Sequence, residues 1–248
     1  MKKYSFPTRQ EMTHISNFVL KRKKKNLSQL RKDSLIWTRT AWENKMDYEV
    51  SWLGLPIIQN PYDIVLMQEL VFGLQPDVII ETGIAHGGSL IFYSSLLELL
   101  GKGKVISVDV DIRKHNRKLI EKHPLVKRVT MLEGSSTDAR IIAQIKKLIK
   151  KKDKVLVVLD SDHRRDHVYN ELQAYKNIVS KNSYIVVFDT FMPYLLGLEG
   201  EQSYFKDNNA MQAVKRFIKE NKSKFVVDKN YNKFFVSSCP DGILKRIK

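Results

Sequence analysis

The chain has 248 residues, of which 43% are hydrophobic and 28% are charged, as in a soluble globular protein with one sizeable core. It contains no apolar run of about 18 residues that would span a membrane and no apolar secretory leader, so we expect a cytoplasmic protein. The single cysteine, Cys239, excludes an internal disulfide and a cysteine-based zinc cluster, and it favours a reducing compartment.

The formal net charge is +16, because 43 lysines and arginines outnumber 27 aspartates and glutamates. The simpler explanation is excess lysine on solvated helix faces. The alternative is peripheral contact with a membrane or with an anionic glycan carrier. The basic residues are spread along the whole chain, and we do not expect nucleic acid to be the partner.

Residues 1–50 differ from the rest, since they are rich in charge and contain no strand-like run. Their apolar spacing predicts two amphipathic helices, marked by Ile15, Phe18 and Val19 and by Leu27, Leu30, Leu35 and Ile36. We interpret residues 1–50 as a helical extension. It would pack on the main domain, residues 51–248, or on a neighbouring subunit of a homo-oligomer.

From residue 62 onwards, helical and strand-like segments alternate with short connections between them. The predicted helices are residues 62–72, 88–100, 112–122, 137–150, 163–179 and 209–222. The predicted strands are residues 78–82, 104–110, 129–133, 155–159, 184–188, 225–227 and 234–237.

The first five predicted strands are apolar almost without alternation, as in a parallel sheet that helices cover on both faces. The last two are joined by a short turn at 229–232, which predicts a hairpin. The pattern therefore predicts an α/β fold. Its centre would be a Rossmann-like, doubly wound sheet of seven strands, mostly parallel with an antiparallel C-terminal strand.

Ligands of an open α/β sheet bind beyond the carboxyl ends of its strands. After the first strand, Gly83, Gly87 and Gly88 leave room for a ligand to approach the backbone. The spacing fits neither a G-x-G-x-x-G dinucleotide loop nor a Walker A loop. Asp109 ends the second strand, where an acidic residue usually binds ribose hydroxyls, and Asp111 is the alternative or a helix cap. Together these features predict a cofactor that contains adenosine.

Carboxylates also follow the fourth and fifth strands. Asp160 and Asp189 could share a hard divalent cation such as Mg²⁺, which would acidify a substrate hydroxyl. His163, three residues after Asp160, is a candidate base. A metal-dependent hydrolase that uses Asp160, Asp162, His163 and His167 is an alternative, because the two histidines have the i, i+4 spacing of metal ligands. A solvated helix start capped by Asp162 would explain the same residues without any metal.

Several short motifs carry a resemblance to a known family. They are Trp52-x-Gly54 with Gln59-Asn60-Pro61, Glu81-Thr82-Gly83-x-x-x-Gly87-Gly88-Ser89, Asp109-Val110-Asp111-Ile112-Arg113, Gly134-Ser135-Ser136, Leu159-Asp160-Ser161-Asp162-His163 and Pro240-Asp241-Gly242-x-Leu244-Lys245-Arg246. From about Trp52 to the C-terminus, the chain resembles the cephalosporin hydroxylase/rhamnosyl O-methyltransferase family of class I S-adenosylmethionine-dependent methyltransferases.

The resemblance implies which residues bind the cofactor. The methionine end of S-adenosylmethionine would be held by Glu81, Thr82, Gly83, Gly87, Gly88 and Ser89. Asp109 would bind the ribose, and Ser135 and Ser136 would lie near the adenine.

The resemblance also implies the catalytic residues. Asp160 would bind Mg²⁺ near the methionine amino group, and His163 would be the base. The wider group of metal-dependent O-methyltransferases has two adjacent polar ligands after the fifth strand, whereas this chain has Phe188-Asp189. Asp162 is therefore a further candidate metal ligand.

The motifs and the resemblance predict an enzyme that methylates a hydroxyl group of a sugar, a glycan or another small molecule, as in polysaccharide biosynthesis. Hydroxylation is not expected, because no iron triad, haem signature or flavin signature is present. A non-catalytic binding protein with a methyltransferase fold is the alternative from another class. The N-terminal helices and residues 193–205, with Tyr194 and Tyr204, are expected to cover the substrate.

Overall fold

The computed structural model describes residues 26–198 and 205–248. The helix expected around residues 15–19 and the side chain of Tyr204 lie outside these ranges. Within them, no helix combines the length and the apolarity that a membrane crossing would require.

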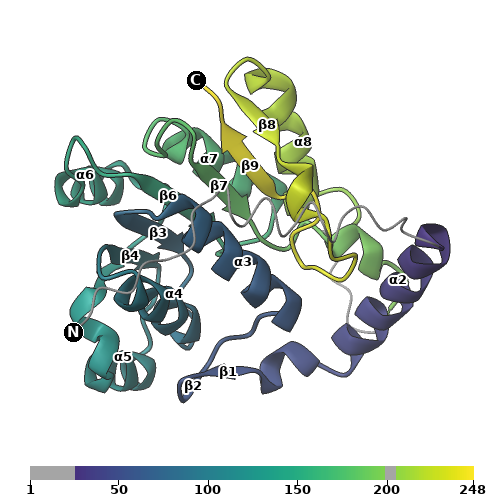
Figure 1. Cartoon of the computed structure of the whole chain (residues 1–248), viewed down its shortest axis with the longest axis horizontal. Coiled ribbons are helices and arrows are strands. Elements are labelled where there is room, and N and C mark those ends of the chain that lie inside the picture. The colour runs from purple at the N-terminus through teal and green to yellow at the C-terminus, as the bar shows by residue number, and fades with distance from the viewer. Residues whose placement is uncertain (1–25, 199–204) are drawn as a thin grey trace.

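A sheet of seven strands forms the centre of the molecule, in the order β5-β4-β3-β6-β7-β9-β8 (Figure 1). The strands are β3 (Val78–Thr82), β4 (Lys104–Asp109), β5 (Val129–Glu133), β6 (Val155–Leu159), β7 (Tyr184–Val187), β8 (Phe225–Val227) and β9 (Ile243–Arg246). Neighbours from β5 to β7 are parallel, and β9 is antiparallel to both β7 and β8. The winding reverses at β3, which opens a crevice at the carboxyl ends of the strands. The predicted fold class is confirmed.

The last strand lies elsewhere than predicted. Residues 234–237 are a loop, and β9 begins only at Ile243. The buried carboxylate of Asp63 accepts hydrogen bonds from Ser237 Oγ at 2.6 Å and from Ser238 N at 2.7 Å, so this segment is held on α3 and not in the sheet. Ile243 and Leu244 are almost completely buried and take the place between β7 and β8. The predicted antiparallel pairing of the last two strands is confirmed, but the predicted tight turn at 229–232 is wrong, because a longer connection separates β8 from β9.

Helices cover both faces of the sheet (Figure 1). They are α3 (Pro61–Leu74), α4 (Gly88–Leu99) and α5 (Lys114–Lys122) on one face and α6 (Ala139–Leu148), α7 (Arg165–Tyr175) and α8 (Ala210–Asn221) on the other. Successive residues of a strand point to opposite faces, so Ile79 packs under the first set and Ile80 under the second. Burying each such side chain contributes about 1.5–3 kcal/mol.

Three of the helices begin two residues later than predicted, namely α5, α6 and α7. The residues that precede them stay in the loops at the strand ends. His163 is thereby left in the β6–α7 loop, and Asp111 is no helix cap, because α5 begins at Lys114. Asp162 does not cap α7 directly either, since Arg164 occupies the N-cap position.

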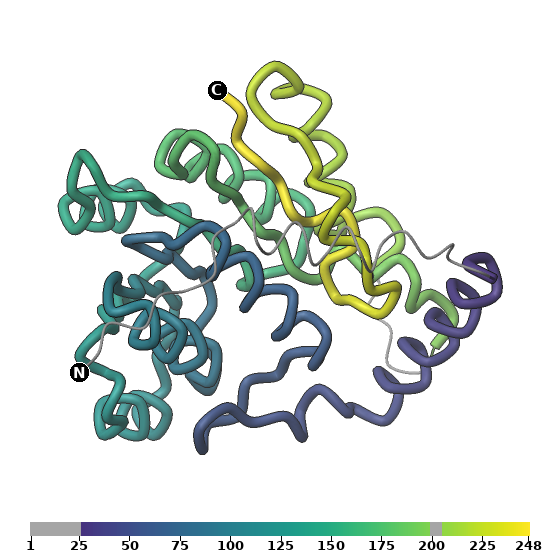
Figure 2. Tube along the Cα trace, viewed as in Figure 1, coloured from purple at the N-terminus to yellow at the C-terminus, as the bar shows by residue number. Residues whose placement is uncertain are grey.

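Helix α2 (Leu27–Glu43) lies at one edge of the molecule, followed by a 3-10 helix (Met46–Glu49) and a small hairpin, β1 (Ser51–Trp52) and β2 (Leu55–Pro56). Figure 2 shows α2, in purple, beside the yellow chain that leads to β9. Its buried residues are Ser34, Thr38 and Ala41, whereas Leu30 and Ile36 are 50% and 63% exposed. The helix therefore packs through these small residues and through the rings of Trp37 and Trp42, which contact Tyr62 and Phe205, whereas the apolar stripe that predicted it faces outward.

Candidate active site

Strand β3 ends in two buried polar residues. Glu81 is 1% exposed, and Ser107 Oγ donates to its Oε2 over 3.4 Å. Burial raises the pKa of Glu81 to about 8, against the effect of hydrogen bonds from Ser89 and Ser107, and the charge of Asp160 raises it further. Thr82 is completely buried, and its Oγ1 has no hydrogen-bond partner among the described residues.

The turn after β3 needs glycine at its first position. Gly83 has φ +91°, and a Cβ atom there would lie 2.0 Å from the carbonyl oxygen of Asp160. This close approach brings the turn against the end of β6. Gly87 and Gly88 allow close packing elsewhere. A Cβ atom on Gly87 would overlap the Ile120 side chain, and one on Gly88 would overlap the Pro56 carbonyl oxygen. Of the three, only Gly83 lines the cavity described below.

Asp109, at the end of β4, ties its strand to the same turn. Its Oδ2 accepts from the backbone N–H of Ile84 at 2.8 Å and, more weakly, from that of Ala85 at 3.4 Å. Its Oδ1 accepts from the backbone N–H of Asp111 at 3.1 Å. The side chain thus faces the crevice, with its orientation fixed by backbone donors.

A cavity of about 470 Å³ opens at the carboxyl ends of β3 to β6. Its walls are Gly83, Ala85, Val108, Asp109, Val110, Ser135, Ser136, Asp160, Ser161, Asp162 and His167. The volume is in the range of small-molecule and cofactor sites, and the lining combines apolar walls with a few polar groups.

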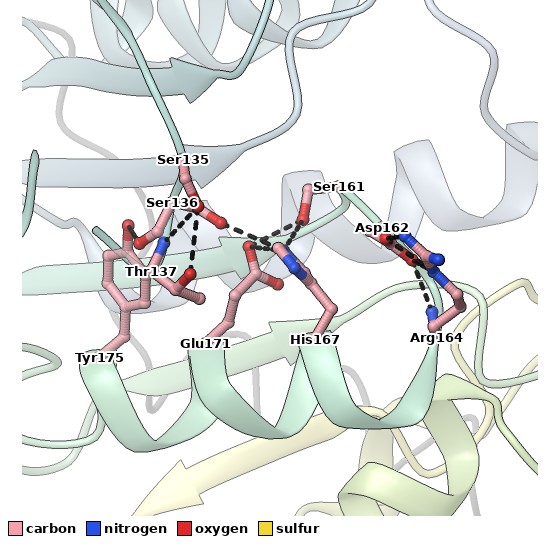
Figure 3. Close-up of polar contacts among 9 residues, drawn as sticks. All are labelled: Ser135, Ser136, Thr137, Ser161, Asp162, Arg164, His167, Glu171 and Tyr175. Carbon is pink, nitrogen blue, oxygen red and sulfur yellow. Dashed lines mark hydrogen bonds and ion pairs between the residues drawn. The ribbon is translucent and has the colours of Figure 1, made fainter.

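One wall of this cavity is a hydrogen-bonded network between three elements (Figure 3). His167 Nε2 lies 3.3 Å from both Ser136 Oγ and Ser161 Oγ and 3.4 Å from Glu171 Oε1. Ser161 Oγ donates to the buried Glu171 at 2.7 Å. The hydrogen bond with Glu171 raises the pKa of His167. His167 thus lines the cavity, and the sequence did not predict this position.

Asp160, His163 and Asp189 form a second cluster, in which one ligand atom from each lies within 4.8 Å of the others. His163 Nδ1 is 2.9 Å from Asp189 Oδ2. Burial and the nearby Asp189 raise the pKa of Asp160 to about 7. Burial opposes the charged imidazolium, but Asp189 and Asp160 outweigh it and raise the pKa of His163 to about 9. The cluster combines two carboxyl groups with one imidazole and lies at the carboxyl ends of β6 and β7.

The remaining metal candidates lie apart from this cluster. Asp162 accepts hydrogen bonds from the backbone N–H and the guanidinium of Arg164, which lower its pKa to about 2. His167 belongs to the network with Glu171. The four residues proposed for a hydrolase therefore do not meet at one point. Phe188 is 3% exposed and packs in the core, so it offers no ligand atom.

Gln59 is a site residue that the sequence did not reveal. Its Nε2 donates to Asp160 Oδ2 over 2.7 Å, although the two residues are 101 positions apart. Its place is set by the start of α3, where Asn60 accepts from the Tyr62 backbone N–H at 3.0 Å and Pro61 is the first helical residue. The Gln-Asn-Pro motif was visible, but its contact with β6 depends on the fold.

The family model described as Rhamnosyl O-methyltransferase/CmcI matches residues 44–247 of the chain. The rhamnosyl O-methyltransferases of Mycobacterium bovis (strain BCG / Pasteur 1173P2) and Mycobacterium tuberculosis (strain ATCC 25618 / H37Rv) are both 29% identical to it over 222 residues. These alignments cover 86% of this chain and 80% of each relative.

Solved structures share the fold at lower sequence identity. A structure of CmcI with Mg and S-adenosylmethionine has a TM-score of 0.59 at 18% identity, covering 81% of this chain and 78% of that one. The S-adenosylhomocysteine-bound methyltransferase PaMTH1 of Podospora anserina has a TM-score of 0.55 at 14% identity, covering 98% of both chains. The residues that the family model matches, 44–247, include the crevice and both of its polar clusters. The chain therefore belongs to the rhamnosyl O-methyltransferase/CmcI family.

Proposed function

We propose that this protein is an enzyme that transfers the methyl group of S-adenosylmethionine to a hydroxyl group of a sugar, a glycan or a related small molecule, with the assistance of Mg²⁺. The observation that carries the proposal is the position of Asp160. It lines the 470 Å³ cavity and also belongs to the cluster with His163 and Asp189. A methyl donor in the cavity and a hydroxyl group at the cluster would therefore meet at this residue. Membership of the family and the names of the mycobacterial relatives support the same activity.

The cavity fits an adenosyl cofactor. Gly83 removes the Cβ atom that would otherwise separate the turn from β6, and Asp109 presents a fixed carboxylate to ribose hydroxyls. Ser135 and Ser136 line the wall on the side of β5, where the adenine would lie. Glu81 is a buried carboxyl group with a raised pKa, and an ammonium group beside it would restore its negative charge.

The cluster fits a divalent cation. Asp160 and Asp189 lie close enough for Asp189 to raise the pKa of Asp160, and positive charge between them would relieve that repulsion. Carboxylate oxygens are the ligands that Mg²⁺ prefers. Gln59 holds one oxygen of Asp160 in place through its amide N–H. We therefore assign Asp160 and Asp189 as the metal ligands and leave Asp162 outside the set.

In the proposed reaction, the acceptor oxygen attacks the methyl carbon in line with the breaking carbon–sulfur bond, whose electron pair stays on sulfur. When bound, S-adenosylmethionine would supply the electrophilic methyl group, and Mg²⁺ held by Asp160 and Asp189 would favour the deprotonated acceptor. His163 receives the proton of the hydroxyl group. At a pKa of about 9 the imidazole is protonated at neutral pH, so it becomes a base only when bound positive charge offsets Asp160 and Asp189.

The test is a methyl-transfer assay with methyl-labelled S-adenosylmethionine, Mg²⁺ and a panel of rhamnosides and other glycosides. It is paired with calorimetric titration of S-adenosylhomocysteine with and without Mg²⁺. We expect binding of S-adenosylhomocysteine and label transfer that a chelator abolishes. A purified, folded protein that does not bind S-adenosylhomocysteine would overturn the proposal.

A further inference from the structure

A second cavity, of about 320 Å³, lies between α2 and the chain that leads to β9. We call it the outer cavity. It is open to solvent on one side and is lined by α2, by Tyr194 of the 3-10 helix Met192–Leu195 and by the loop that precedes β9. Its lining residues are Arg31, Ser34, Leu35, Thr38, Tyr194, Asn232, Phe234, Phe235, Ser237, Pro240 and Asp241. None of them lines the cofactor cavity.

A narrow cleft adjoins the outer cavity on the side of the reaction centre. Its volume is about 10 Å³; Thr38 and Ser237 line both spaces, and the other walls of the cleft include Asn60 and Phe191. Asn60 directly follows Gln59, which holds Asp160, and Phe191 comes two residues after Asp189. The cleft therefore places the outer cavity beside the chain segments that carry Gln59 and Asp189. Burial raises the pKa of Asp47 in the cleft wall, and Asp189 is near enough for its charge to raise that pKa further.

The walls of the outer cavity are held by hydrogen bonds that are buried on one side and exposed on the other. Asp63 is completely buried, and it accepts from Ser237 Oγ at 2.6 Å and from Ser238 Oγ at 2.5 Å. On the opposite side, Arg39 donates to the carbonyl oxygens of Tyr194 and Leu196 at 2.6 Å and 3.0 Å, which joins α2 to the 3-10 helix. A site with fixed walls loses little entropy when it binds a ligand.

The chemistry of the lining combines aromatic surfaces with planar polar groups. Phe234, Phe235 and Tyr194 supply the aromatic surface. The guanidinium carbon of Arg31 lies 5.1 Å from the centre of the Phe235 ring, and the described residues give Arg31 no carboxylate partner. Its N–H donors are therefore available to a ligand.

On the same wall, Asn232 Nδ2 donates to Asp241 Oδ1 over 2.5 Å, which leaves further acceptor positions on the carboxylate. A sugar ring matches this surface, because its C–H face packs on aromatic rings while its hydroxyl groups need donors and acceptors around the edge. A purely apolar ligand would leave Arg31 and Asp241 desolvated without compensation.

We propose that the outer cavity is the acceptor site, and that it binds a glycoside whose sugar ring lies on Phe235 and Phe234 with Arg31 as a hydrogen-bond donor to its oxygens. The inference rests on the proposed methyl transfer and adds the location and the chemical class of the acceptor. Helix α2 supplies Arg31, Ser34, Leu35 and Thr38, so it is part of the binding site as well as a cover.

The test is ligand-observed saturation-transfer NMR, with a nitrophenyl rhamnoside as the probe and protein loaded with S-adenosylhomocysteine. The variants are Arg31→Ala and Phe235→Leu. The matched control is Lys32→Ala, which removes the adjacent exposed cation of α2 from outside the cavity lining. Thermal unfolding and S-adenosylhomocysteine affinity are measured on every sample.

We expect the probe to bind the wild type and Lys32→Ala, and its Kd to rise by about tenfold or more in Arg31→Ala and Phe235→Leu, a loss of about 1.4 kcal/mol. Affinity for S-adenosylhomocysteine should stay unchanged in all four proteins. Unchanged probe affinity in both variants would overturn the proposal, and so would absence of probe binding to the wild type. Either result, together with normal S-adenosylhomocysteine binding, leaves the proposed methyl transfer intact, whereas loss of that binding in the wild type overturns the methyl transfer itself.

Discussion

The crevice at the carboxyl ends of the strands has two halves, one formed mainly by backbone and the other by ionisable side chains. Over β3, β4 and β5 it is largely backbone, where the Gly83 turn lies against β6 and the amides of Ile84 and Ala85 hold Asp109. Over β6 and β7 it is made of ionisable side chains, with Asp160, His163 and Asp189 in one cluster. Backbone geometry depends on steric fit, whereas the carboxylate cluster depends on charge. The two halves should therefore respond to different perturbations.

The largest expected effect is on the backbone half, from Gly83→Ala. The new Cβ atom would overlap a carbonyl oxygen that cannot move away, and the backbone has φ +91°. We expect S-adenosylhomocysteine affinity to fall by about 100-fold or more, with a lower unfolding temperature. Calorimetry and thermal unfolding measure both effects. The control is Gly73→Ala, where a Cβ atom meets nothing within 4 Å, and equal effects at the two positions would contradict the steric explanation.

Asp160→Asn tests the charged half. It removes one negative charge from the cluster while it keeps the size of the side chain, so kcat should fall by about 100-fold or more and no longer depend on Mg²⁺. Asp162→Asn should keep the Mg²⁺ dependence, because Asp162 is bonded to Arg164. Asp166→Asn, at an exposed ion pair with Arg165 in the first turn of α7, is the control for activity. A rate for Asp160→Asn that rises with Mg²⁺ as in the wild type would place the metal elsewhere.

The pH dependence of stability gives an intermediate effect that involves both halves. Glu81 has its pKa raised by burial from 4.5 to about 8, and His163 has its pKa raised from 6.5 to about 9 by Asp189 and Asp160 despite its burial. Each group binds its proton more tightly in the folded protein than in the unfolded chain. For each group, the contribution to the free energy of unfolding is complete below its pKa in the unfolded chain. It is lost as the pH rises through its pKa in the folded protein.

The free energy of unfolding of the protein without ligand or metal should therefore decrease between about pH 5 and pH 9. Urea denaturation at several pH values measures this, and Mg²⁺ should have its largest stabilising effect at the alkaline end, where the carboxylates are ionised. A stability that rises over the same range would contradict the raised pKa values of Glu81 and His163 in the folded protein.

The smallest expected effect is at the wall that joins the two halves. His167→Ala removes a side chain that contacts Ser136, Ser161 and Glu171 but belongs to neither the turn nor the metal cluster (Figure 3). We expect S-adenosylhomocysteine affinity to fall by about three- to tenfold, the cost of one hydrogen-bonding group. His115→Ala, at an exposed position of α5, should have no effect on calorimetric affinity. A loss of Mg²⁺ dependence in His167→Ala would place it in the catalytic cluster instead.

The sequence by itself determined the parts of this protein that depend on local geometry. The mainly apolar runs of β3, β6 and β7 specify parallel strands that are covered on both faces, because every side chain of these three strands is buried. The glycine turn and the carboxylates after the strands were also visible, since the carboxyl ends of parallel strands meet at one edge. Residues whose role depends on one strand end or one turn, such as Gly83 and Asp109, could thus be placed from the sequence.

Only the tertiary structure decided which distant side chains meet. Gln59 contacts Asp160, which is 101 residues away in the sequence. Asp63 binds Ser237 and Ser238 across more than 170 residues, so the strand predicted at 234–237 is a loop and the last strand, β9, is Ile243–Arg246. The same long-range packing separated His167 from His163 and turned the apolar stripe of α2 outward. A local sequence pattern predicts the conformation of a segment. The free energy of burying a charged group such as Asp63 depends instead on hydrogen-bond partners that are brought to it only in the folded chain.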